Sequence, residues 1–152
     1  MKYEGHDVCD LITFYYSFES FSPILYTSYL ILIIMDIESF HTYCLSKKGV
    51  EETFPFDEVT LVFKVMGKMF ALTSLKAEVF RVNLKCDPEK ALELREEYPA
   101  IIPGWHMNKK HWNTVYFEEG LEDALLIELI DHSYDLVVKG LKKKDRELLA
   151  AL

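Results

Sequence analysis

Alternating apolar and polar positions predict β-strands in the middle of this chain. In the segment 60–65 the residues Leu61, Phe63 and Val65 share one face. Met66-Gly67 predicts a tight hairpin turn because glycine accepts a positive φ, and 69–72 then returns as the partner strand. A third strand is expected over 79–85, where Phe80, Val82 and Leu84 alternate with Arg81, Asn83 and Lys85. A fourth is expected over 114–117.

Helical spacing predicts four helices around these strands. Asp36 is a good N-cap for a helix with apolar positions Ile37, Phe40, Cys44 and Leu45, which we expect to end at Gly49. Asp87-Pro88 begins a second helix that stops before Pro99. A long helix over 121–139 ends at Gly140, and a short one follows the basic run 142–144, whereas 101–104 is expected to be a turn. Hairpins with few crossovers favour the α+β class: a single domain with an antiparallel sheet and helices packed on one face.

Residues 1–34 differ in character from the rest of the chain. They contain one basic residue, Lys2, and a nearly continuous apolar stretch near their end. An acidic start without a small-residue cleavage site argues against a secretory signal, and a transmembrane length is reached only by including Glu19. A weak membrane anchor and a start-site artefact upstream of Met35 remain as alternatives, and we favour the second. We therefore expect a non-family extension over 1–34 and one domain over 35–152 that has no membrane role.

Composition narrows the functional classes. The formal charge of −8 over 152 residues excludes a generally basic nucleic-acid coat protein, although a local basic patch is compatible with it. The three cysteines, Cys9, Cys44 and Cys86, form no C-x-x-C pair, which argues against a disulfide scaffold or a zinc ribbon. They favour a reducing compartment, so we expect the protein to be cytoplasmic. Cys44 lies on an apolar helix face and is expected to be a small buried residue.

Motifs of catalysis and cofactor binding do not occur. The chain has no G-x-S-x-G, no glycine-rich phosphate loop and no H-E-x-x-H. His106 and His111 are five residues apart in a predicted loop, without a matching ligand pair beside them. We expect a protein that is not an enzyme and that has no catalytic residues, metal or cofactor.

The densest polar and aromatic run of the chain is 105–113. Lys109 and Lys110 form a positive patch with His106 and His111, between Trp105 and Trp112. Basic groups beside aromatic rings are typical of surfaces that bind nucleic acid, and Asn108 and Asn113 carry amides suited to base edges or phosphate oxygens. The donors Arg81, Asn83 and Lys85 follow each other on the predicted third strand, about 7 Å apart. A solvated sheet face with aromatic core residues has the same pattern, so both interpretations stay open.

Several segments resemble the MmcQ/YjbR family of small bacterial proteins. The matching runs are Tyr43–Lys47, Phe54–Phe56, Phe63–Val65, Gly67–Ala71, Val82–Pro88, Pro103–Val115, His132–Val137 and Leu141–Arg146. The resemblance covers about residues 36–148, and the Pro103–Val115 run is its most specific part. It implies a compact α+β domain with a secretion-chaperone-like arrangement, also described as a double-wing DNA-binding fold, without established catalytic residues or cofactor.

The resemblance and the residue patterns lead to one functional hypothesis and its rivals. We expect a DNA-binding or regulatory protein in which Lys109, Lys110, Arg81 and Lys85 contact phosphates. The remaining candidate interface residues are Asn83, His106, Asn108, His111, Trp112 and Asn113. The main alternative is a chaperone-like module that binds a protein partner and has no nucleic-acid role. A third hypothesis, a small-molecule role, follows from the family's association with an antibiotic cluster.

Overall fold

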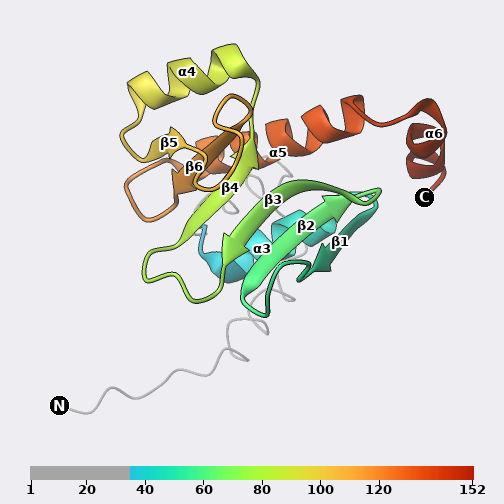
Figure 1. Cartoon of the computed structure of the whole chain (residues 1–152), viewed down its shortest axis with the longest axis horizontal. Coiled ribbons are helices and arrows are strands. Elements are labelled where there is room, and N and C mark those ends of the chain that lie inside the picture. Colours follow the sequence, from blue (N-terminus) through green and yellow to red (C-terminus); the bar gives the residue numbers. More distant parts are fainter. Residues whose placement is uncertain (1–34) are drawn as a thin grey trace, which may run out of the picture. The chain divides into compact units, whose positions relative to one another are not determined.

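The computed structural model describes residues 35–152, which form four helices and a six-stranded sheet (Figure 1). In chain order the elements are α3 (Ile37–Ser46), β1 (Val50–Thr53), β2 (Thr60–Val65), β3 (Lys68–Ser74), β4 (Arg81–Lys85), α4 (Pro88–Glu97), β5 (Ile101–Pro103), β6 (Trp112–Tyr116), α5 (Asp123–Lys139) and α6 (Lys143–Ala151). The interpretations of residues 1–34 concern a segment outside the described residues. Within 35–152, no helix combines the length and the apolar character needed to cross a membrane.

The strands form one sheet in the order β1-β2-β3-β4-β6-β5, and every neighbouring pair is antiparallel. The predicted β2–β3 hairpin is confirmed. Its turn residues Met66 and Gly67 have φ values of 49° and 73°, the positive pair that a two-residue type I′ connection requires. The β2–β3 register shifts after Phe63, which faces Ala71 while the next residue faces Met69. This bulge leaves Phe70 without a partner on β2.

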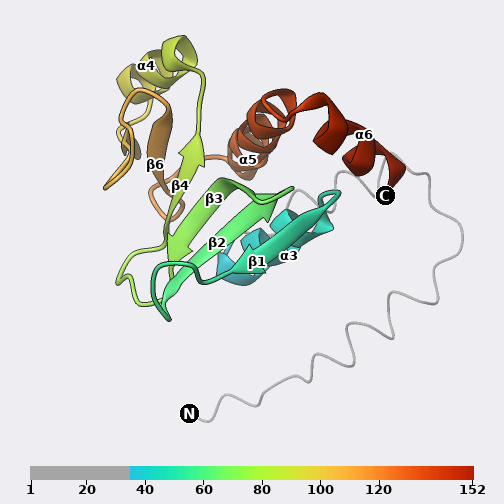
Figure 2. The same ribbon diagram turned by 45° about the vertical axis from the view of Figure 1, so that its right-hand side comes forward.

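All four helices contribute buried side chains to one core on one face of the sheet (Figure 2). Phe40 of α3, Leu94 of α4, Ile130 of α5 and Leu149 of α6 belong to the same buried cluster as the inward-facing residues of the strands. Phe40 packs edge-on against Phe63 with ring centroids 5.4 Å apart, the favoured geometry of an aromatic pair. The predicted α+β class, with an antiparallel sheet and helices on one face, is confirmed.

Three local predictions were wrong. β1 was missed because its two glutamates are poor strand formers, and it forms by pairing with β2 along one edge. The segment expected to be a turn at 101–104 contains β5, the opposite edge strand, where Pro103 is tolerated because one side of the strand has no partner. Helix α3 ends at Ser46 rather than Gly49; the glycine has a φ of 66° and turns the chain into β1.

Ser133 of α5 joins two strands where the β3–β4 ladder stops. The ladder's last pair toward this end is Ala71 with Leu84, so Phe70 and Lys85 do not bond directly. Instead, the fully buried Ser133 hydroxyl accepts from the Lys85 N–H at 2.8 Å and donates to the Phe70 carbonyl. The side chain of a helix thereby satisfies two backbone groups just beyond the end of the β3–β4 ladder.

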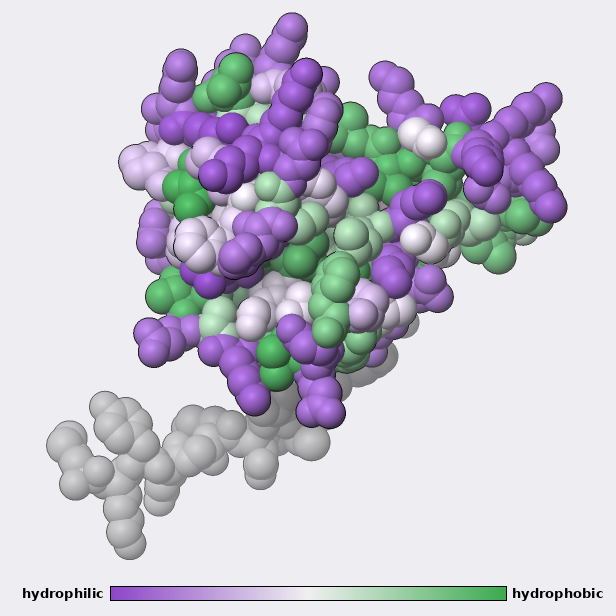
Figure 3. Space-filling model, in the orientation of Figure 1, coloured by the Kyte–Doolittle hydropathy of each residue, from purple (hydrophilic) through white to green (hydrophobic). Residues whose placement is uncertain are grey.

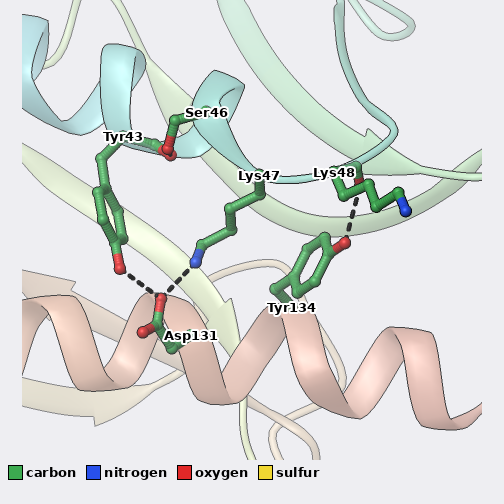
Figure 4. Close-up of polar contacts among 6 residues, drawn as sticks. All are labelled: Tyr43, Ser46, Lys47, Lys48, Asp131 and Tyr134. Carbon is green, nitrogen blue, oxygen red and sulfur yellow. Dashed lines mark hydrogen bonds and ion pairs between the residues drawn. The ribbon is translucent and has the colours of Figure 1, made fainter. Parts of the chain in front are cut away.

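A polar cluster fixes α3 against α5 (Figure 4). The Tyr43 hydroxyl donates to Asp131 Oδ1 at 2.7 Å, and the Lys47 ammonium pairs with the same oxygen. The ammonium also lies 4.5 Å from the centroid of the Tyr43 ring and 5.4 Å from that of Tyr134. Tyr134 donates to the Lys48 carbonyl at 2.7 Å. Burial, together with the Asp131 carboxylate, raises the pKa of Tyr43, so the phenol stays a donor.

Candidate nucleic-acid interface

The loop 104–111 connects β5 to β6 and is anchored to the sheet at its start. The Gly104 N–H donates to the Trp112 carbonyl at 2.8 Å, and the Trp105 N–H donates to Thr114 Oγ1 at 2.9 Å. The Thr114 hydroxyl in turn donates to Asn83 Oδ1. A Cβ added at Gly104 would lie 2.8 Å from the Trp112 Cβ and 2.9 Å from its carbonyl oxygen, so this close approach requires glycine.

The second half of the loop is held by backbone contacts. Asn108 accepts from the Lys110 N–H through its side chain at 3.0 Å and from the His111 N–H through its carbonyl at 3.0 Å. The His111 carbonyl accepts from Cys86, and the Lys109 carbonyl accepts from the Arg95 guanidinium at 2.6 Å. The loop is therefore a structured connection. It leaves the side chains of His106, Asn108, Lys109, Lys110 and His111 exposed.

Two predicted interface residues are buried. Trp112 packs against Val62 and Leu72 in a small second cluster. The Lys85 ammonium lies 5.5 Å from the centroid of the Trp112 ring. The Asn113 carboxamide accepts from Arg95 Nε at 2.8 Å on the helix-covered side. The side chains of Trp112 and Asn113 are thus engaged in contacts within the protein, and neither is placed to touch a ligand at the surface.

The predicted row of donors on β4 lies on the face opposite the helices. Arg81, Asn83 and Lys85 are half-buried and alternate with the fully or almost fully buried Val82 and Leu84, as expected from the sequence. Register places Asn83 beside Thr114 and Lys85 beside Trp112. The structure therefore brings the β4 row next to the strand that follows the loop 104–111.

Charge is segregated between the two faces. On the face opposite the helices, the strands carry Lys64, Arg81 and Lys85 against one carboxylate, Glu51, which register places beside Lys64. The loop adds Lys109 and Lys110. Helices α4 and α5 with their N-caps hold the acidic residues Asp87, Glu89, Glu93, Glu96, Glu97, Glu122, Asp123, Glu128, Asp131 and Asp135, against Lys90, Arg95 and Lys139. Figure 3 shows the open face of the sheet, with weakly apolar surface over the strands between hydrophilic side chains. An acidic protein thus presents a face whose ionised side chains are mainly basic.

The described cysteines lack the properties of reactive thiols. Cys44 is fully buried, as predicted, and burial raises the pKa of its thiol well above the ordinary value. Burial also raises the pKa of Cys86 to about 11. Both thiols stay protonated at neutral pH and are poor nucleophiles. Among residues 35–152, no three His, Cys, Asp or Glu side chains are grouped as a metal site would require.

Comparisons with known proteins give the same fold and the family. A Deinococcus radiodurans protein, DR2400, with a domain of the family DUF419, superposes with a TM-score of 0.71 at 42% identity, covering 77% of this chain and 89% of that one. A Pseudomonas syringae protein gives a TM-score of 0.58 at 28% identity, covering 67% of this chain and 98% of its own. The class is thus an α+β domain that solved structures share.

Sequence relatives place the chain within that class. The family model YjbR matches residues 45–136. The Escherichia coli O157:H7 protein YbdF is 45% identical over 117 residues, which is 74% of this chain and 96% of that protein. YjbR of Escherichia coli K12 is 35% identical over 118 residues, which is 78% of this chain and all of that protein. The chain belongs to the YjbR family.

Proposed function

We propose that this chain is a non-enzymatic DNA-binding protein whose interface is the open sheet face together with the loop 104–111. The observation that carries the proposal is the charge segregation: the sheet face and the loop hold basic groups, and the helices on the other side hold most of the acids. A polyanion that approaches the open face is attracted by these basic groups, because the carboxylates that would repel it lie mainly on the other side of the sheet.

The roles of the side chains follow from their placement. Arg81 and Lys85 on β4, with Lys109 and Lys110 on the loop, contact phosphates. The exposed His106, Asn108 and His111 reach sugar or base edges, which is where sequence is read. Asn83, Trp112 and Asn113 hold the strand and the loop in place, because their side chains are engaged in the contacts described above.

The proposal predicts a definite salt dependence. Each neutralised phosphate contributes about −0.9 to the slope of log K against log salt, so four contacts give a slope of about −3.6. Between about 50 and 200 mM salt the affinity then falls about 150-fold. Fluorescence anisotropy of the full chain with a labelled duplex of about 20 base pairs measures this directly. Absence of binding at the lower salt overturns the proposal, and so does binding without a salt slope.

A different observation favours the protein-binding alternative. Large apolar side chains are exposed on two loops at the end of the sheet away from 104–111: Phe54 and Phe56 between β1 and β2, and Leu75 and Val79 between β3 and β4. The loops are joined where the Leu75 N–H donates to the Val59 carbonyl at 2.8 Å. If this end binds a second copy of the chain, the molar mass in solution is that of a dimer. Phe54→Ser with Phe56→Ser then yields the monomer, and a wild-type monomer at high micromolar concentration contradicts this alternative.

A further inference from the structure

The loop 104–111 lines an open hollow that includes two residues of the proposed interface, His106 and Lys109. Pro103, Gly104, Trp105, His106, Met107 and Lys109 line a space of about 440 Å³. That volume is within the range of small-molecule sites in proteins, roughly 300–1,000 Å³. Its walls combine an indole, a thioether and an imidazole with one ammonium group. The loop itself contains no acidic residue.

Trp105 is held at its backbone and exposed at its ring. Its N–H is fixed by Thr114, yet 57% of the residue is accessible to solvent. The other tryptophan, Trp112, is only 6% exposed because it packs into the second cluster. Leaving a large aromatic ring in water forgoes the stabilisation that burial gives, about 1.5–3 kcal/mol for a large apolar side chain. A ring that is positioned but uncovered is therefore available to a ligand.

His106 adds a second sign of a built site. It has a φ of 55°, in the left-handed region that residues other than glycine rarely adopt. A turn closed by the Met107 N–H and the Gly104 carbonyl, at 3.3 Å, holds it there. Its ring stands edge-on to the indole, with centroids 5.0 Å apart and planes at 77°. Such strained positions occur preferentially at ligand sites, and here the strain sets the imidazole beside the indole.

We propose that this hollow receives one unpaired nucleobase of a nucleic-acid strand, stacked on the Trp105 indole, with its phosphate on the Lys109 ammonium. The inference rests on the proposed function and specifies its substrate. Every base has a π-face that an indole can stack on, whatever the sequence. In a duplex these faces are covered by neighbouring bases, and a base must first be unstacked. The chain therefore binds single-stranded or locally melted DNA through a contact that an intact duplex lacks.

The test compares two probes and two variants of the full chain. The probes are labelled oligothymidylate of about ten nucleotides and a labelled duplex of about 20 base pairs, titrated by anisotropy. Trp105→Ala removes the stacking surface of an exposed side chain, so folding is unaffected. Its single-strand affinity falls about 5- to 150-fold, the range for loss of one base–aromatic stack, and its duplex affinity changes less than about twofold. Trp105→Phe keeps a stacking ring and retains most of the single-strand affinity.

An abasic strand of the same length provides the matched ligand control, because it keeps the phosphates and lacks the bases. The wild-type chain binds it about as weakly as Trp105→Ala binds oligothymidylate. If Trp105→Ala binds oligothymidylate as the wild type does, the inference is overturned, while salt-dependent duplex binding keeps the proposed function intact. If the wild type binds neither the single strand nor the duplex, both are overturned.

Discussion

Replacing Ser133 by alanine removes one hydroxyl that links two strands and a helix. The side chain is fully buried, and it bonds to the Phe70 carbonyl and the Lys85 N–H beside the bulge. Alanine fills almost the same volume, so the change leaves no significant cavity. What is lost is the hydrogen bonding of two backbone groups that have no strand partner for these bonds.

The expected cost follows from the burial of the two groups. The Phe70 carbonyl is buried, and leaving a buried polar group unsatisfied costs about 1–3 kcal/mol. The Lys85 N–H is partly buried, so losing its hydrogen bond to Ser133 costs about 1 kcal/mol. We therefore expect Ser133→Ala to lower the free energy of unfolding by about 2–4 kcal/mol. This is a large part of the roughly 5–15 kcal/mol that stabilises a typical domain.

Urea denaturation of the full chain, followed by circular dichroism, measures the change. The m-value should stay constant while the midpoint falls. Ser46→Ala is the matched control: its exposed hydroxyl donates to the Tyr43 carbonyl within the same helix, and its removal should change stability by less than about 0.5 kcal/mol. If Ser133→Ala is as stable as this control, the hydroxyl does not bridge the strands and the reasoning fails.

Three further predictions concern the loop, a histidine and a thiol. Gly104→Ala forces a Cβ against Trp112, and denaturant titration should show a loss of about 1–3 kcal/mol; unchanged stability would refute the close approach. Burial lowers the pKa of His132 below its ordinary 6.5, and the neutral Nε2 of His132 accepts from the Asp87 N–H. The contribution of His132 to stability is therefore complete above pH 6.5 and decreases as the pH falls below that value. Unfolding at pH 7.5 and 5.5 should show this decrease in the wild type and a smaller one in His132→Gln. Cys86, with its raised pKa, should resist iodoacetamide at pH 8 until denaturant is added, and rapid labelling of the folded chain by mass spectrometry would contradict its burial.

The fold was predictable where a local pattern determines an element. Strand β4 alternates cleanly, and its donor row faces away from the helices as expected. Strands β1 and β5 were not predictable in this way. Val50–Thr53 contains two glutamates and Ile101–Pro103 has three residues, so neither carries a periodicity, and both exist because a neighbouring strand pairs with them.

The sequence indicated which residues lie in and around the candidate site, but not the direction in which each side chain points. Trp112 and Asn113 were expected to face a ligand, but β6 begins at Trp112, two residues earlier than predicted. Consecutive strand residues point to opposite faces, so these two side chains enter different layers. The supporting contacts of Arg95 and Thr114 join segments far apart in the chain, and no local sequence signal indicates them.

We propose that the open face and its loop, rather than the lysines of the chain in general, bind DNA. The most direct test compares the salt slopes of two double variants that remove the same charge. Lys109→Ala with Lys110→Ala changes the loop. Lys142→Ala with Lys144→Ala changes exposed lysines at the start of α6, which Figures 1 and 2 both place apart from that loop.

Anisotropy with the labelled duplex of about 20 base pairs, at salt concentrations from about 50 to 200 mM, gives both slopes. We expect the loop variant to reduce the slope by about 2 and the α6 variant to leave it within about 0.5 of the wild type. Equal slopes for the two variants would contradict binding through this face, because the affinity would then follow the net charge of the chain.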